Sequence, residues 1–179
     1  MRIDKKDNSG YTLVELIIVI AIIAVMTGAG AMTIGAIRTS QATASMQSFD
    51  DELAALEMRT KSQSADNAIL LERDGTDYKI YYGTYDSKAS VPSFNKTDPG
   101  KADAVLERVT IMYDSTNYDA DSSTAVEIED SQIIQFRKSD GEVIIGAGQY
   151  KFLKYGSNQS VGRITLSKYV GSHTYGNND

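Results

Sequence analysis

An uninterrupted apolar run near the start of the chain constrains the fold most strongly. Residues 16–26 read Leu-Ile-Ile-Val-Ile-Ala-Ile-Ile-Ala-Val-Met, and within residues 11–37 the only charged side chain is Glu15. About twenty apolar residues are enough to cross a bilayer as a helix. The sequence therefore predicts a transmembrane helix over residues 11–37. The preceding residues 1–10 are polar and carry three basic side chains, which holds that end in the cytoplasm and places the rest of the chain outside.

The helical pattern continues beyond the apolar run and becomes one-sided. Apolar residues recur at spacings of four, three, four and three, which marks one stripe on a helix. This stripe consists of Ala42, Met46, Phe49, Leu53 and Leu56. No proline occurs before Pro92 to break the helix. We expect one helix from about residue 11 to about residue 62, with residues 38–63 as its amphipathic continuation and the stripe packed on a sheet.

We expect the remaining residues, 64–179, to form a β-rich globular domain. Short alternating runs are separated by clusters of Gly, Asp, Asn and Ser, which is typical of antiparallel strands. The expected strands are 78–82, 105–113, 125–129, 132–138, 142–145, 149–155 and 162–169. Residues 84–104 and 114–124 read as loops, and Ser139-Asp140-Gly141 as a hairpin turn. The expected fold class is α+β: one long N-terminal helix on an antiparallel sheet with one buried face.

The amino-acid composition excludes several classes of protein function. The 179-residue chain has no cysteine, which excludes disulfides, thiol catalysis and cysteine-bound zinc, and its single histidine is His173. No nucleophile and base pair stands out, so we expect a protein that is not an enzyme and that needs no cofactor. The formal net charge is −6, which disfavours a nucleic-acid binder that works through global charge.

The residues Gly10-Tyr11-Thr12-Leu13-Val14-Glu15, between a basic leader and the apolar run, resemble the N-terminal motif of type IV pilins and type II secretion pseudopilins. The resemblance is specific because the glutamate stands five residues after the glycine. It implies the pilin fold and a leader cut between Gly10 and Tyr11 by a membrane prepilin peptidase. It also implies N-methylation of Tyr11, and an assembly role for Glu15, which meets the N-terminal amine of a neighbouring subunit.

That resemblance implies a structural subunit of a type IV pilus-like filament. The subunit is expected to sit in the cell membrane as a single-pass protein with its C-terminal domain outside. An assembly platform then joins it to other pilin subunits in an extracellular pilus or pseudopilus. The alternative is a minor tip subunit that binds DNA, a surface or a secreted substrate. Met32 stands where many major pilins carry a proline, which keeps this alternative open.

A second resemblance lies nearer the C-terminus. Ile134-Gln135-Phe136, then Asp140-Gly141, then Gly162-Arg163-Ile164-Thr165-Leu166 are similar to strands and a turn of H-type minor pseudopilins. Hairpin chemistry alone produces the same letters, so both readings stay open.

Two weaker candidate sites remain. Four oxygen-bearing residues lie close together and are a candidate calcium site, with a solvated acidic loop as the alternative: Asp114, Asn117, Asp119 and Asp121. Arg163 and Lys168 are candidate DNA contacts, because residues 143–179 carry four basic residues against one acid. Solvated strand faces are the alternative there.

Overall fold

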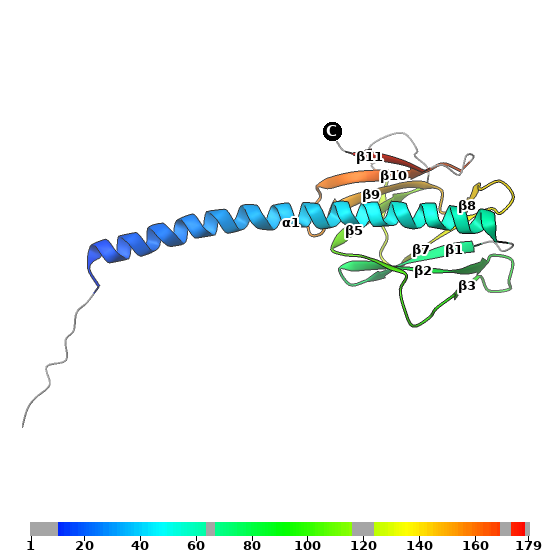
Figure 1. Cartoon of the computed structure of the whole chain (residues 1–179), viewed down its shortest axis with the longest axis horizontal. Coiled ribbons are helices and arrows are strands. Elements are labelled where there is room, and N and C mark those ends of the chain that lie inside the picture. Colours follow the sequence, from blue (N-terminus) through cyan, green and yellow to red (C-terminus); the bar gives the residue numbers. More distant parts are fainter. Residues whose placement is uncertain (1–10, 64–66, 116–123, 169–172, 178–179) are drawn as a thin grey trace, which may run out of the picture. The chain divides into compact units, whose positions relative to one another are not determined.

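The long helix, α1 (Leu13–Ser62), begins and ends close to the predicted positions in the computed structural model, which describes residues 11–63, 67–115, 124–168 and 173–177 (Figure 1). Its last turn carries Arg59 and Lys61, whose positive charges are favourable at the negative end of a helix dipole. The contacts divide the chain into two units, residues 1–37 and residues 38–179.

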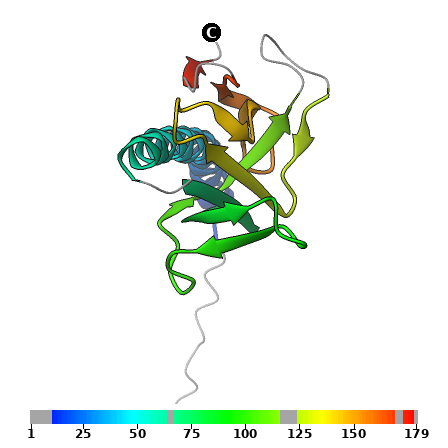
Figure 2. The same cartoon turned by 90° about the vertical axis from the view of Figure 1, so that its right-hand side faces the viewer.

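The described strands of the second unit form two antiparallel sheets, both on one side of the helical residues 38–62 (Figure 2). The first sheet has the order β3-β2-β1-β7-β8, with β4 also paired to β2. Its strands are β1 (Asn67–Asp74), β2 (Asp77–Asp86), β3 (Ser93–Lys96), β4 (Ala104–Leu106), β7 (Ser131–Phe136) and β8 (Val143–Ile145). The second sheet has the order β11-β10-β9-β5-β6. Its strands are β5 (Val109–Asp114), β6 (Val126–Glu127), β9 (Gly148–Lys154), β10 (Ser160–Leu166) and β11 (His173–Asn177).

The core lies between α1 and the two sheets. The five stripe residues Ala42, Met46, Phe49, Leu53 and Leu56 are all fully buried. The Phe49 ring lies against Tyr150 and Phe152 of β9, with centroids 5.3 Å and 5.5 Å away. Gly162 of β10 lies so close to the helix that a Cβ there would be 2.6 Å from the Met46 Cε atom. The helix therefore packs against residues that follow it by about a hundred positions.

A polar contact also joins the helix to the first sheet. The Tyr82 hydroxyl donates to Glu52, 2.5 Å from the carboxylate Oε2 and 3.0 Å from the main-chain carbonyl oxygen. The Arg59 guanidinium lies 3.8 Å from the centre of the same ring. Burial, together with the Glu52 carboxylate, raises the pKa of Tyr82 well above the usual tyrosine value. The hydroxyl thus stays protonated and keeps donating to the helix.

The expected α+β architecture is confirmed: an N-terminal helix packs on antiparallel β structure. The prediction of a single sheet was wrong in detail, because the strands divide between two. The expected run 105–113 is split at Arg108, whose φ of 48° turns the chain from β4 in one sheet to β5 in the other. β1 and β11 were missed, and β3 and β4 begin inside the segment 84–104, which was predicted as a loop.

Candidate processing and assembly site

The first turn of α1 is closed by a reciprocal pair of side chains. Thr12 precedes the helix, and its hydroxyl oxygen accepts the Glu15 backbone N–H at 3.3 Å. In return, Glu15 Oε2 accepts the Thr12 backbone N–H at 2.8 Å and the Thr12 hydroxyl at 3.0 Å. This arrangement is a capping box, which satisfies N–H groups that a helix start otherwise leaves without partners. Glu15 therefore has a structural task within its own chain.

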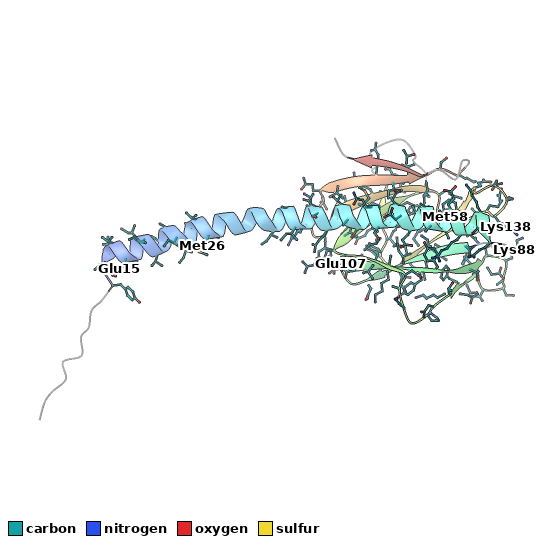
Figure 3. All side chains as sticks on the ribbon, in the orientation of Figure 1. Glu15, Met26, Met58, Lys88, Glu107 and Lys138 are labelled. Carbon is teal, nitrogen blue, oxygen red and sulfur yellow. The ribbon has the colours of Figure 1, made fainter. Side chains whose placement is uncertain are left out.

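The predicted processing residues lie immediately before this turn. Tyr11 is 88% exposed, so its backbone and ring are accessible. Gly10 lies outside the described residues, and with it one side of the Gly10–Tyr11 bond. Glu15 is also exposed, and Figure 3 labels it in the first turn of the helix. The structure thus brings Glu15 and Thr12 together close to Tyr11.

The helix that follows is apolar on every side. Each large apolar side chain from Leu13 to Met26 is more than half exposed. A shallow depression of about 350 Å³ runs along one face between Ile18 and Met26. So large a continuous apolar surface marks an interaction site with protein or membrane. Within the described ranges, no helix meets the length and hydropathy expected of a membrane span.

Residues 5–31 match the family model described as the prokaryotic N-terminal methylation motif. The chain carries a prepilin leader. This leader is of the kind found in type IV pilins and pseudopilins, and it indicates a structural subunit that prepilin peptidase processes. The matched segment contains Gly10, Tyr11 and Glu15. A search of curated proteins and of solved structures found no match to the chain.

The H-type resemblance and the calcium site stay predictions. Asp114 is 4% exposed, and its Oδ2 accepts the Thr124 hydroxyl at 2.6 Å. Asn117, Asp119 and Asp121 lie outside the described residues. No group of three or more potential metal ligands occurs among the residues that the structure describes.

The candidate DNA contacts occupy one end of the second sheet. Arg163 is half-buried on β10, and Lys168 is exposed just after that strand ends. His173 lies in β11, but its side chain is outside the described part of the chain. The DNA assignment stays a prediction.

Sequence reasoning missed the role of Thr12. The spacing Thr-x-x-Glu before an apolar run is the sequence pattern of a capping box, so Thr12 was identifiable as the hydrogen-bond partner of Glu15. The bond between Tyr82 and Glu52 had no such local signal, because the two residues are thirty positions apart.

Proposed function

We propose that the chain is a structural subunit of a type IV pilus-like filament, held in the membrane through residues 11–37 before assembly. Prepilin peptidase cuts between Gly10 and Tyr11, and Tyr11 becomes the methylated N-terminus. The assembly platform then transfers the helix from lipid into a bundle of identical or related helices. The observation that carries this proposal is the apolar surface of residues 13–26, exposed on all sides, with a single carboxylate at its start.

Glu15 is the residue that we expect to register one subunit against the next. An ionised side chain within an apolar helix bundle is unfavourable unless an opposite charge meets it. The Tyr11 amine of a neighbouring subunit supplies that charge after leader removal. Because the Thr12 bonds converge on Oε2, the carboxylate is held in a fixed orientation while Oε1 is available for the incoming amine.

Two substitutions separate the capping role of Glu15 from its charge. Glu15→Gln keeps an oxygen that accepts the Thr12 bonds but removes the charge. Thr12→Val removes the hydroxyl bonds and keeps the Glu15 carboxylate. We expect Glu15→Gln and Glu15→Ala to insert into the membrane and lose their leader normally, but to yield little sheared extracellular subunit. Thr12→Val should assemble better than Glu15→Gln.

The measurement is the ratio of sheared extracellular subunit to membrane-held subunit, with Glu107→Gln as a matched loss of an exposed carboxylate in the globular unit (Figure 3). Where little filament is sheared even from wild type, complementation of the filament phenotype replaces this ratio. Wild-type-like assembly of Glu15→Gln would show that charge pairing is not the mechanism. N-terminal sequencing and intact mass should show a chain that begins at Tyr11, and a chain beginning at Met1 or after Ala31 would overturn the proposal.

A further inference from the structure

Charge is unevenly distributed along the globular unit. No aspartate or glutamate occurs from Val143 to Asn178, and residues 143–179 carry a net charge of +3. Because the whole chain carries −6, the other residues carry −9. The basic segment contains β9 and β10, which pair as a hairpin in the second sheet. One strand pair of an acidic protein is therefore positively charged.

Two of these cations lie directly opposite each other. Arg163 of β10 is the register partner of Lys151 of β9. Tyr150 and Phe152, the neighbours of Lys151 on β9, are fully buried toward the helix, so Lys151 and Arg163 lie on the outer face of the sheet. Like charges opposite one another on neighbouring strands destabilise a sheet. The hairpin therefore carries two opposed cations on its outer face.

Among the described residues, Arg163 has no countercharge. Within the part of the chain that the structure describes, no carboxylate lies within ion-pair distance of its guanidinium. Its side chain lies over Gly176 of the edge strand β11, where a Cβ would be 3.4 Å from the Arg163 Cγ atom. The Arg163 side chain therefore packs against the backbone of the edge strand β11.

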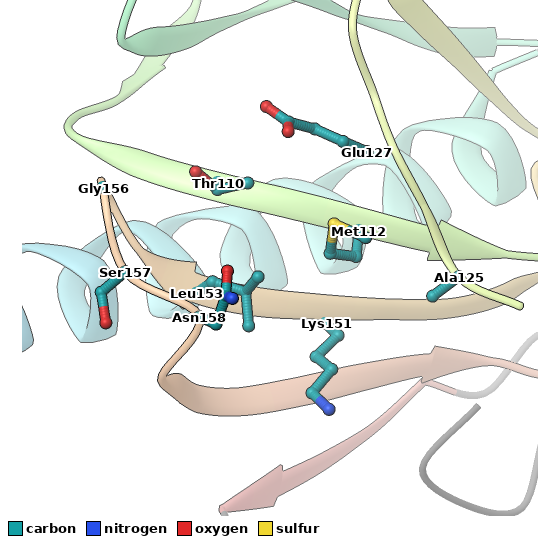
Figure 4. A pocket seen from close by; sticks show the side chains of 9 residues that line it. All are labelled: Thr110, Met112, Ala125, Glu127, Lys151, Leu153, Gly156, Ser157 and Asn158. Atoms are coloured by element: carbon teal, nitrogen blue, oxygen red, sulfur yellow. The ribbon is translucent and has the colours of Figure 1, made fainter. Parts of the chain in front are cut away.

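A groove of about 550 Å³ lies beside this pair on the same face. Met112 and Leu153 contribute apolar surface to it, and Lys151 stands at its edge (Figure 4). Glu127 also lines the groove, but it points away from Lys151 in Figure 4 and is 2.5 Å from Arg73 in an ion pair. The charge of Glu127 is therefore neutralised by Arg73. Lys151 and Arg163 lie on the outer face of the sheet beside the groove.

We propose that the outer face of the β9–β10 hairpin, centred on Arg163 and Lys151, binds the acidic surface of a neighbouring copy of this chain. The proposal rests on the filament function, because a contact between two different surfaces of identical subunits produces a helical filament when it does not close into a ring. A chain whose hairpin is positive and whose remainder is strongly negative offers such a pair of surfaces. A polyanion such as DNA would instead be repelled by most of the molecule.

The acidic counterpart is Glu129 together with Asp130. Both side chains are exposed, and they are consecutive in the chain between β6 and β7. Neither carboxylate has a hydrogen-bond or ion-pair partner among the described residues. Within the described ranges, Glu129 and Asp130 have no cation and Arg163 has no acid, so the two pairs of opposite charge are complementary.

The test uses the full chain in cells that assemble the filament. Lys151→Glu with Arg163→Glu should reduce sheared subunit by about tenfold or more, equivalent to about 1.4 kcal/mol per contact. The matched control is Lys88→Glu with Lys101→Glu, two exposed lysines outside the hairpin whose reversal changes the net charge equally. We expect the control to assemble like wild type, and leader cleavage to be normal in both variants.

A variant with uncharged side chains tests whether loss of assembly results from misfolding. Lys151→Gln with Arg163→Gln removes both charges without reversing them, so its melting temperature should stay close to that of wild type while its assembly falls. A residue pair with a purely structural role would not give that combination. Adding Glu129→Lys and Asp130→Lys to the charge-reversed hairpin should restore assembly.

Equal assembly of the hairpin variant and its control would overturn the proposal. Failure of the double swap to restore assembly would overturn the assignment of Glu129 and Asp130. Normal assembly combined with loss of DNA binding in a gel-shift assay would show that the surface is a polyanion site instead. If wild type itself forms no filament, the proposed function fails, and this outcome is distinct from failure of the hairpin contact alone.

Discussion

Replacing Phe49 by alanine should unfold the globular unit at a markedly lower temperature. The ring is fully buried and lies against two aromatic rings, Tyr150 and Phe152, at interplanar angles of 48° and 55°. Truncation removes the ring from a position where α1 contacts β9, the middle strand of the second sheet. Because β9 is paired on both sides, by β5 and β10, the sheet has little freedom to collapse into the space left behind.

The magnitude follows from burial. Truncation of a fully buried phenylalanine to alanine typically costs about 3–5 kcal/mol, part of it for the cavity that remains. Each tilted aromatic pair contributes a further share of about 0.5–1.5 kcal/mol beyond its buried area, so the loss should lie toward the upper end of that range. In a unit of this size, about 1 kcal/mol shifts the melting temperature by about 2–4 °C. We therefore expect a shift on the order of 10 °C.

The assay is thermal and urea unfolding of the full chain in detergent micelles, followed by near-ultraviolet circular dichroism. The chain has eleven tyrosines and no tryptophan, so this signal reports largely on tyrosines such as Tyr150. Met58→Ala is the control, because Met58 is apolar, lies on the same helix and is 72% exposed. Exposed substitutions of this kind change stability by about 0.5 kcal/mol or less. If Phe49→Ala unfolded at the same temperature and urea concentration as Met58→Ala, the packing described for the helix would be incorrect.

Three further predictions concern contacts between the helix and the sheets. Tyr82→Phe removes the hydroxyl that donates to Glu52, and should lower the free energy of unfolding by about 1.5–3 kcal/mol in urea titrations. The pKa of Tyr82 is raised in the folded protein. The stabilisation by the protonated hydroxyl is therefore complete below about pH 10, where an unfolded tyrosine is also protonated. This stabilisation decreases as the pH rises above that value. Tyr82→Phe should therefore flatten the alkaline part of a stability–pH profile, and an unchanged slope would contradict this assignment. Gly162→Ala forces a Cβ to within 2.6 Å of Met46 and should cost about 1–3 kcal/mol, whereas Gly100→Ala, where the nearest atom is 3.6 Å away, should leave the midpoint of unfolding nearly unchanged.

Local patterns in the sequence predict the helix and most of the strands. The stripe from Ala42 to Leu56 keeps a helical period, and the structure places all of it at 0% exposure. The turn at Ser139-Asp140-Gly141 joins β7 to β8, which pair as a hairpin, because Asp-Gly between apolar runs favours this geometry. These features depend on residues that are close together in the chain.

The parts that were missed depend on distant partners. β1 lies between β2 and β7, and its consecutive residues Ala68 and Ile69 are both buried, so it shows no polar alternation. β3 and β4 are short strands paired with β2, within a segment whose proline and glycine residues indicate a loop. Which side chains face each other also depends on register. The opposition of Arg163 and Lys151 follows from the pairing of β9 with β10 and is invisible in composition.

The contact between the helix and the second sheet also sets the order in which the molecule can form. The stripe on α1 is complete at Leu56, but β9 and β10, which cover it, end at Lys154 and Leu166. Contacts between residues so far apart in the sequence close large loops and form slowly. During synthesis, the stripe therefore remains without its covering strands until the chain has been made as far as Leu166. The helix comes first in the sequence, and its packing against the second sheet can begin only after β9 and β10 have been made.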